Sequence, residues 1–193
     1  NNLWFAIDTY DRDKGDHNLP FSDENFSNGF EFLVEVISAD SAAILVDEPY
    51  SVYTDVYNDY IPVYASQENS NGIFTRQFML TNRTRTSLTG EKTDSVVIDR
   101  SHLQYGKSSD PNFSNADWYY DGNSGTMEMR LDWHLLNVSS PAKRFVLDDK
   151  AGTRAIEYTS TDAFKIYAFV LDKNNAEVTR FPGNGPYSYT WET

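Results

Sequence analysis

Apolar and polar residues alternate in several segments of this chain, and turn-forming residues separate the segments. The clearest alternation is FEFLVEV, residues 30–36. Successive side chains of a β-strand point to opposite faces of its sheet. The alternation predicts a strand with one face on a core and the other mostly in water. The core side would hold Phe30, Phe32, Val34 and Val36, and the opposite side Glu31, Leu33 and Glu35.

The segment FKIYAFVLD, residues 164–172, is apolar at positions of both parities. A strand of this kind is buried on both faces, so we expect it in the centre of a sheet. No segment keeps the helical spacing of apolar residues for more than about a turn and a half. The pattern therefore predicts an all-β chain with under about a tenth of its residues helical. Strands are expected at 3–9, 29–38, 42–47, 51–56, 73–81, 94–103, 117–120, 126–132, 155–158, 164–172 and 187–191.

Long connections rich in Asn, Ser, Asp, Gly and Pro separate the predicted strands, as expected for turns. They lie at 11–28, 58–72, 84–93, 105–116 and 173–186. A chain of 193 residues is long enough for one sizeable core. We therefore expect a single sandwich domain, residues 1–193, with elaborated ends. Because the chain begins within an apolar stretch, we also expect it to be a fragment of something larger.

Charge and composition exclude several functions. The formal net charge is −13 and the pI is about 4.5, which disfavours nucleic acids and anionic membrane surfaces as partners. There is no apolar run of about 18 residues that would predict a membrane span. The chain contains no cysteine, so disulfides, thiolate zinc sites and cysteine nucleophiles are excluded.

The stretch AIDTYDRDKGD places four aspartates, Asp8, Asp11, Asp13 and Asp16, within nine positions. Calcium takes six to eight oxygen ligands in flexible geometry, which suits such a loop. The spacing is not that of an EF-hand, because Gly15 stands one position early and Ser22 replaces the closing glutamate. We expect a structural calcium site here. A solvated acidic turn and a catalytic role are the alternatives.

Two aromatic clusters are candidates for ligand binding, because exposed rings can stack on the C–H faces of sugars. Tyr53 and Tyr57 share strand parity within a segment of five tyrosines, 50–64. Trp118 and Tyr119 belong to the second cluster, DWYYDGN. The alternative for both clusters is ordinary packing in tyrosine-rich hairpins.

Catalysis has weaker support in the sequence. Glycoside hydrolysis needs two carboxylates about 5 to 10 Å apart, and among 29 acidic residues some pair will meet that condition by chance. Glu128 and Asp132 share a strand face with Arg130 between them, which favours an ion-paired surface. The three histidines have no metal-binding spacing, and no serine has the G-x-S-x-G setting. We therefore expect no enzyme activity.

The stretch 125–149 contains the signature E-x-R-x-x-W-x-L-L-N-x-S-x-P, from Glu128 to Pro141. Within it, WHLLNV predicts one helical turn, capped by Asp132, with Trp133 and Leu136 packed under the sheet. Together with IDTYD and GD near the start, this signature resembles family 9 carbohydrate-binding modules and the related DOMON-like domains of exported bacterial proteins. The resemblance implies a jelly-roll-like antiparallel β-sandwich, frequent bound calcium and glycan recognition. Such domains usually open with a further N-terminal strand, which is missing here.

These observations predict a non-catalytic, calcium-stabilised carbohydrate-binding module attached to a larger exported or cell-surface protein. Its partners would be a polysaccharide or other glycan and further domains of the parent chain, in an extracellular, periplasmic or cell-surface location. The alternative is a structural or interaction module that makes contacts between domains or cells without binding sugar. A glycoside-active enzyme is the third hypothesis.

Overall fold

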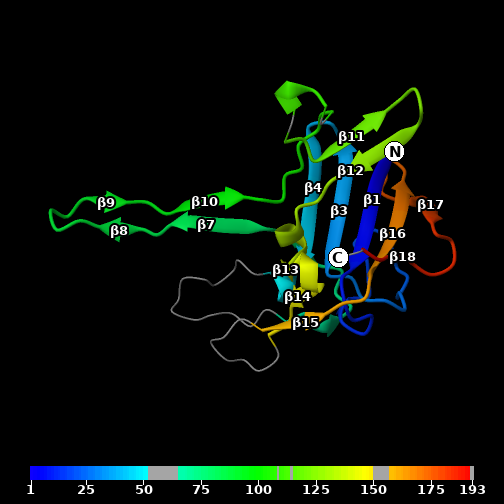
Figure 1. Ribbon diagram of the computed structural model, residues 1–193, viewed down its shortest axis with the longest axis horizontal. Coiled ribbons are helices and arrows are strands. Elements are labelled where there is room, and N and C mark those ends of the chain that lie inside the picture. Colours follow the sequence, from blue (N-terminus) through cyan, green and yellow to red (C-terminus); the bar gives the residue numbers. More distant parts are fainter. Residues whose placement is uncertain (52–64, 108, 114, 150–156, 192–193) are drawn as a thin grey trace.

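The computed structural model describes residues 1–51, 65–107, 109–113, 115–149 and 157–191 (Figure 1). Strands make up 46% of the structure and short helical turns 7%, which confirms the predicted all-β chain with little helix. The predicted strand 51–56 lies outside the described residues from position 52 on, and so do residues 155 and 156 of the predicted strand 155–158.

One seven-stranded antiparallel sheet, here called the main sheet, forms the body of the molecule (Figure 1). Strand β16 lies between β1 on one side and β17 and β18 on the other, so its predicted central position is confirmed. The order across the sheet is β17 (Glu177–Phe181), β16 (Phe164–Leu171), β1 (Asn2–Asp8), β3 (Phe32–Ser38), β4 (Ser41–Asp47) and β6 (Phe74–Arg76), with β18 (Tyr187–Tyr189) also paired to β16.

Smaller units surround this sheet. A ribbon that projects from the body (Figure 1) consists of β7 (Phe78–Asn82) with β10 (Val96–Asp99) and of β8 (Arg85–Thr86) with β9 (Lys92–Thr93). The hairpin, as it is called below, consists of β11 (Trp118–Asp121) and β12 (Thr126–Met129). The remaining strands are β13 (Val138–Ser140), β14 (Phe145–Leu147) and β15 (Tyr158–Ser160), which form one sheet, and β2 (Gly15–Asp16) and β5 (Glu68–Asn69), which pair in parallel.

Four short 3₁₀ turns complete the described secondary structure: η1 (Glu48–Tyr50), η2 (Pro111–Phe113), η3 (Trp133–Leu136) and η4 (Pro141–Lys143). Turn η3 confirms the helical turn predicted in WHLLNV. Asp132 stands at its N-cap but its side chain makes no capping hydrogen bond, and Asn137 ends the turn in the left-handed region at φ 53°. Leu135 and Leu136 are buried, whereas Trp133 is 37% exposed rather than packed under the sheet. No helix among the described residues is long and apolar enough to cross a membrane.

Apolar side chains pack on both faces of the main sheet. On one face, Phe32, Val34 and Ile44 pack with residues of the hairpin, η3 and β13. On the other face, Leu33 and Phe169 pack under the segment 19–30, which contributes three phenylalanines. The hairpin and the segment 19–30 thus form the layers that cover the sheet.

The expectation that one side of residues 30–36 lies mostly in water is wrong. Leu33 is fully buried because the segment 19–30 covers it, and Glu31 is fully buried where it accepts hydrogen bonds from Thr9 and Ser66. Phe30 precedes the strand and packs in the same core as Leu33, whereas Phe32 packs on the opposite face. Alternation correctly separates the two faces of β3, but it does not show that a loop closes the second one.

Four predicted loops contain short strands. The loop 173–186 includes β17, which pairs with β16, and the loop 84–93 includes the tip strands β8 and β9. The loops 11–28 and 58–72 include β2 and β5, which pair with each other. Conversely, the predicted strand 126–132 ends at Met129. The missed strands are short or polar edge strands, and their pairing depends on neighbours rather than on a local apolar pattern.

Candidate functional site

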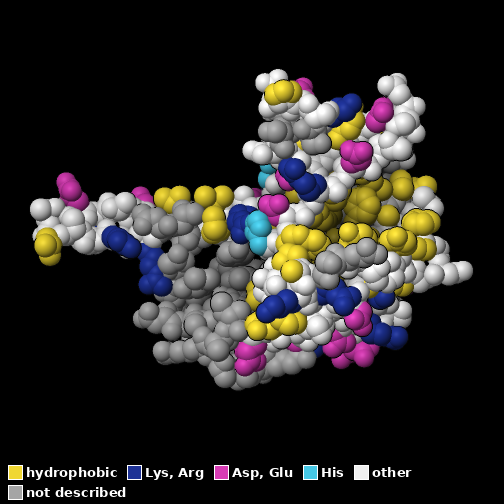
Figure 2. Space-filling view, in the orientation of Figure 1, with side chains coloured by type: hydrophobic (Ala, Val, Ile, Leu, Met, Phe, Trp, Pro, Cys, Tyr) yellow, Lys and Arg dark blue, Asp and Glu magenta, His cyan; other side chains and the backbone are white. Residues whose placement is uncertain are grey.

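An open groove of about 710 Å³ lies between the main sheet and the hairpin. Its lining is almost entirely apolar, and Arg130 is the one charged residue in it. Figure 2 shows apolar side chains gathered in a hollow on this face of the body. The groove is lined by Leu3, Phe5, Ile7, Met127, Met129, Arg130, Leu131, Trp133, Leu136, Phe164, Ile166 and Tyr189.

Strand alternation builds the floor and one wall of this groove. Leu3 and Phe5 of β1 and Ile166 of β16 project to the same face, and all three are only partly buried. In β12, the half-buried Met127 and Met129 alternate with more exposed residues. The hairpin thus stands over the sheet with its methionines toward the floor, without filling the space between them.

One end of the groove is aromatic. The ring of Trp133 lies 5.2 Å from that of Trp191 and 6.2 Å from that of Phe164, measured between centroids. The Trp191 indole N–H donates a hydrogen bond of 3.0 Å to the Pro141 carbonyl, which fixes the position of that ring. Trp133 and Tyr189 remain 37% and 43% exposed, so flat aromatic surface is accessible to a ligand.

A smaller polar cavity of about 170 Å³ adjoins the groove and shares Met129 and Arg130 with it. Two of the sequence-predicted ligand residues, Trp118 and Tyr119, line this cavity together. Tyr105 packs against both rings, at centroid distances of 4.8 and 5.8 Å. The other lining residues are Gly106, Ala116, Asp117, Glu128, Met129 and Arg130.

Charged side chains surround the aromatic rings of the polar cavity. The Arg130 guanidinium donates to the Ala116 carbonyl at 3.1 Å, and the Asp117 carboxylate accepts the Gln104 backbone N–H at 2.8 Å. The expected ion-paired strand face is wrong, because no salt bridge between described residues joins Arg130 to Glu128 or Asp132. Asp132 instead lies 3.9 Å from His134. The Arg130 guanidinium and the exposed Glu128 carboxylate therefore remain available to a ligand.

Only half of the predicted ligand residues can be placed. Tyr53 and Tyr57 lie outside the described residues. Trp118 is 93% buried, since only 7% of its surface is exposed, whereas Tyr119 is half-buried with Lys107 5.9 Å from its ring centroid. Tyr119 therefore has more surface to offer a ligand than Trp118, whose role is largely to support the cavity wall.

The four predicted metal-binding aspartates have separate roles. Asp8 and Asp16 are buried, and their carboxylates accept backbone N–H groups, from Tyr10 at 3.1 Å and from Asn18 at 2.8 Å respectively. Asp11 accepts the Asp13 N–H at 3.2 Å, and Asp13 lies 3.3 Å from Arg12 at the surface. Among the described residues, no group of three or more His, Cys, Asp or Glu side chains is placed to hold a metal. The predicted calcium site stays a prediction.

Two further buried carboxyl groups lie near these aspartates, and the sequence did not single them out. Glu31 is fully buried; burial raises its pKa well above the ordinary value, and the Asp8 charge adds to the effect. Burial also raises the pKa of Asp8 to about 6, partly opposed by the hydrogen bond from Asn28. Both groups therefore favour the protonated form more than an exposed carboxyl does.

Asp47 is the second of these groups. Burial raises the pKa of Asp47 to about 7, and the nearby charge of Asp16 contributes to this rise. Its Oδ2 accepts the Asn69 side-chain N–H at 2.9 Å, while its buried Oδ1 has no hydrogen-bond partner. A buried carboxylate oxygen without a partner is costly, so this position would gain from a cation.

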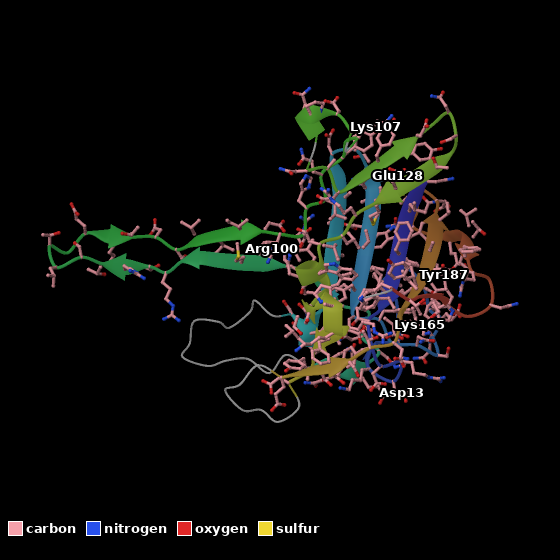
Figure 3. All side chains as sticks on the ribbon, viewed as in Figure 1. Asp13, Arg100, Lys107, Glu128, Lys165 and Tyr187 are labelled. Carbon is pink, nitrogen blue, oxygen red and sulfur yellow. The ribbon has the colours of Figure 1, made fainter. Side chains whose placement is uncertain are left out.

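The two candidate regions lie at opposite ends of the main sheet. Figure 3 shows Glu128 and Lys107 beside the hairpin, and Asp13 and Lys165 at the other end of the body. A ligand in the polar cavity would therefore not touch the aspartate loop. Any metal there would act on stability rather than on ligand contacts.

No family model, curated protein or solved structure matches this chain.

Proposed function

We propose that this chain is a non-catalytic carbohydrate-binding module of an exported or cell-surface protein. The observation that carries the proposal is the polar cavity, in which Tyr119 lies beside the carboxylates of Asp117 and Glu128 and the guanidinium of Arg130. Sugar recognition requires an aromatic face for the C–H groups and charged or polar side chains for the hydroxyls. The cavity supplies both.

Affinity electrophoresis against a panel of plant, algal and bacterial polysaccharides tests this proposal. Retardation by at least one polysaccharide is expected, with weak affinity, because a shallow site leaves little free energy after the ligand loses its freedom. Tyr119→Ala should abolish the retardation. Tyr120→Ala is the matched control, since Tyr120 neighbours Tyr119 on β11, is 49% exposed and lines neither cavity. Equal retardation of both variants would contradict the assignment of the site.

The same samples distinguish binding from catalysis. We expect no release of reducing sugar ends. An enzyme activity would need paired carboxylates, and in this cavity Asp117 and Glu128 would be that pair. Release that disappears in Glu128→Gln would replace the binding proposal by an enzyme.

Calcium remains part of the proposal, at a position shifted from the predicted one. Asp16 and Asp47 are buried near one another, and Asp47 Oδ1 has no partner. The Asn69 amide nitrogen donates to Asp47, and its oxygen already accepts the Asn71 backbone N–H. The Asp16 and Asp47 carboxylates would be the protein ligands of a bound calcium ion, which would supply charge neutralisation and cross-linking of β2 and β4.

Thermal unfolding with and without calcium tests this assignment. Added calcium should raise the melting temperature by mass action, and chelator should reverse the rise. Asp47→Asn should remove the calcium response, whereas Asp13→Asn at the surface should keep it. If neither calcium nor chelator changed the melting temperature, the aspartates would act only as hydrogen-bond acceptors that shape the loop.

An interaction module is the second candidate, and the projecting ribbon favours it. Phe78, Val97 and Ile98 of the ribbon are each at least 44% exposed. Exposed apolar side chains gathered on one element mark protein contacts. Replacing Val97 and Ile98 by threonine discriminates the two functions, because it removes exposed apolar surface from the ribbon and should leave glycan retardation unchanged. Loss of retardation would favour the ribbon as the binding element.

A further inference from the structure

Strand β10 of the projecting ribbon exposes apolar side chains on both of its faces. All four of its residues are exposed, and three of them, Val96, Val97 and Ile98, are apolar and consecutive. Successive strand residues point to opposite faces, so neither face of β10 is polar. Apolar residues on both faces are typical of a strand inside a sheet, and three of them in a row are not expected on a free surface unless they have a function.

One edge of β10 is open. Among the described residues β10 pairs only with β7, and the two strands form a two-stranded sheet that projects from the body (Figure 1). The register of this pair is irregular in β7, because the consecutive Val96 and Val97 pair with Asn82 and Leu80. β10 itself is regular. An unpaired edge without Pro or Lys is a template for another strand, and a two-stranded ribbon alone is marginally stable in water.

The sequence around β10 is complementary to itself. Residues 94–100 read DSVVIDR, with an acid at one end, a base at the other and the apolar run between them. When two copies align antiparallel about Val97, their apolar runs lie opposite each other, and Asp94 of each copy lies opposite Arg100 of the other. Side chains directly opposite on paired strands are about 5 Å apart, and opposite charges there are stabilising. The remaining acid, Asp99, faces a serine, so like charges do not meet.

The ribbon also differs in charge from the rest of the molecule. The whole chain carries a net charge of −13, so two copies repel each other over most of their surface. Residues 76–100, which comprise the ribbon and its base, contain five basic and three acidic residues. A contact through this segment therefore brings two copies together where their repulsion is least.

We propose that β10 pairs with β10 of a second copy of this chain, so that two ribbons form a four-stranded antiparallel sheet in the order β7–β10–β10–β7. The contact is related by a two-fold axis at Val97. Such a contact closes on itself and gives a dimer rather than a filament. The inference goes beyond the proposed glycan function and does not depend on it, because the polar cavity lies on the body and not on the ribbon.

Sedimentation velocity of the whole chain at increasing micromolar concentrations tests the inference. A monomer–dimer equilibrium is expected. Asp94→Lys sets a lysine opposite Arg100 at both ends of the paired strands, so it should raise the dissociation constant of the dimer by at least about tenfold. Asp40→Lys is the matched control, because it makes the same change of charge at an exposed position in the turn between β3 and β4. It should leave the dimer intact.

A pair of complementary variants gives the sharpest test. Arg100→Glu sets a glutamate opposite Asp94, so it should also dissociate the dimer. An equimolar mixture of Asp94→Lys and Arg100→Glu should form a mixed dimer, because each copy then offers the charge that the other one needs. Recovery in the mixture would also show that both variants are folded.

Three outcomes would overturn the inference: a parent chain that stays monomeric, a parent chain that forms larger assemblies, and a dimer that both charge variants retain. So would a mixture that stays monomeric although each variant keeps the far-UV circular dichroism of the parent. Val97→Lys, which sets two lysines against each other at the two-fold axis, should dissociate the dimer as well. It keeps the inference testable if a charge variant misfolds.

Discussion

The two faces of the main sheet are built from alternate residues of the same strands, yet one is closed and the other is open over β1 and β16. On the closed face, Trp4 and Ala6 of β1 pack with Phe169 of β16 and are almost fully buried. On the open face, Leu3 and Phe5 are partly exposed in the groove. The strands are equally apolar on both faces, so the difference comes from what covers them.

The cover of the closed face is a segment with its own aromatic side chains. Phe21 and Phe26 reach Phe169 at centroid distances of 5.2 and 5.9 Å. Arg180 lies 5.2 Å from the Phe26 ring centroid and bonds Glu24 at 2.6 Å and Glu177 at 2.7 Å, tying the segment to β17. The hairpin on the open face brings methionines and charged residues instead. A closed face therefore stabilises the fold, whereas an open one leaves apolar surface for a ligand.

The largest expected effect concerns the closed face. Phe169→Ala should lower the free energy of unfolding by about 3–5 kcal/mol, because the side chain is fully buried and its removal leaves a cavity among packed rings. Phe5→Ala on the open face is the matched control and should cost about half as much, since part of that ring already contacts water. Urea unfolding measures both. Equal losses would mean that the groove is as well packed as the core.

The second expected effect is a pH dependence of the free energy of unfolding that comes from Asp8 on the closed face. Asp8 continues the inward-facing series of Trp4 and Ala6 in β1, and burial raises its pKa from 3.8 to about 6. A folded-state pKa above the unfolded value means that the folded chain keeps a proton that the unfolded chain releases. The contribution of Asp8 is therefore full below pH 3.8 and is lost as the pH rises through 6. The loss amounts to about 3 kcal/mol at most, at about 1.4 kcal/mol for each pKa unit.

Asp8→Asn isolates this contribution, because an amide does not ionise in this range. Urea unfolding at intervals from pH 4 to pH 7 should show stability falling with pH in the parent chain and falling less in the variant. The Asn oxygen can still accept the Tyr10 N–H, and its amide can donate to a turned Asn28 side chain. Parallel pH profiles for the two proteins would show that Asp8 ionises as an exposed carboxyl does.

The sequence predicted the parts of the fold in which a local pattern decides the structure. Strands β1, β3, β4 and β16 follow from alternation or from continuous apolar runs, because a pleated strand must place such residues on a core. Strand β17 was missed, since residues such as Glu177 and Arg180 show no apolar face and the strand forms only because β16 offers it an edge. The burial of Glu31 was missed for a related reason: alternation assigns a face, but not the loop that covers it.

The candidate site was predicted in part for the same reason. Trp118 and Tyr119 stood out as an aromatic cluster and do line one cavity. The groove floor, including Leu3 and Phe5, could not be distinguished from a core, because the same alternation produces both. Which face stays open depends on contacts distant in sequence, between β1 and the hairpin more than 100 residues away. The one sequence signal for the open groove was the pair Met127 and Met129, which alternate with polar or charged residues in β12.

The smallest expected effect concerns Glu31, the fully buried acid near Asp8. Its carboxyl accepts the Thr9 backbone N–H at 2.7 Å, the Thr9 hydroxyl at 3.1 Å and the Ser66 hydroxyl at 3.0 Å. Glu31→Ala leaves these buried donors without an acceptor, so it should cost about 1–3 kcal/mol. Glu31→Gln should cost much less, because its carbonyl can serve Thr9 while its amide donates to the Ser66 oxygen.

Glu35→Ala, at a half-buried position of β3 four residues after Glu31, is the control for Glu31 and should change the free energy of unfolding by less than about 0.5 kcal/mol. Urea unfolding at pH 7 compares the three variants. Because burial and the Asp8 charge raise the pKa of Glu31, the neutral glutamine relieves the cost of a buried charge, which partly offsets its imperfect fit. If Glu31→Gln were as damaging as Glu31→Ala, the negative charge itself, rather than the hydrogen bonds, would hold Thr9 and Ser66 together. That result would make Glu31 a candidate cation ligand beside Asp8.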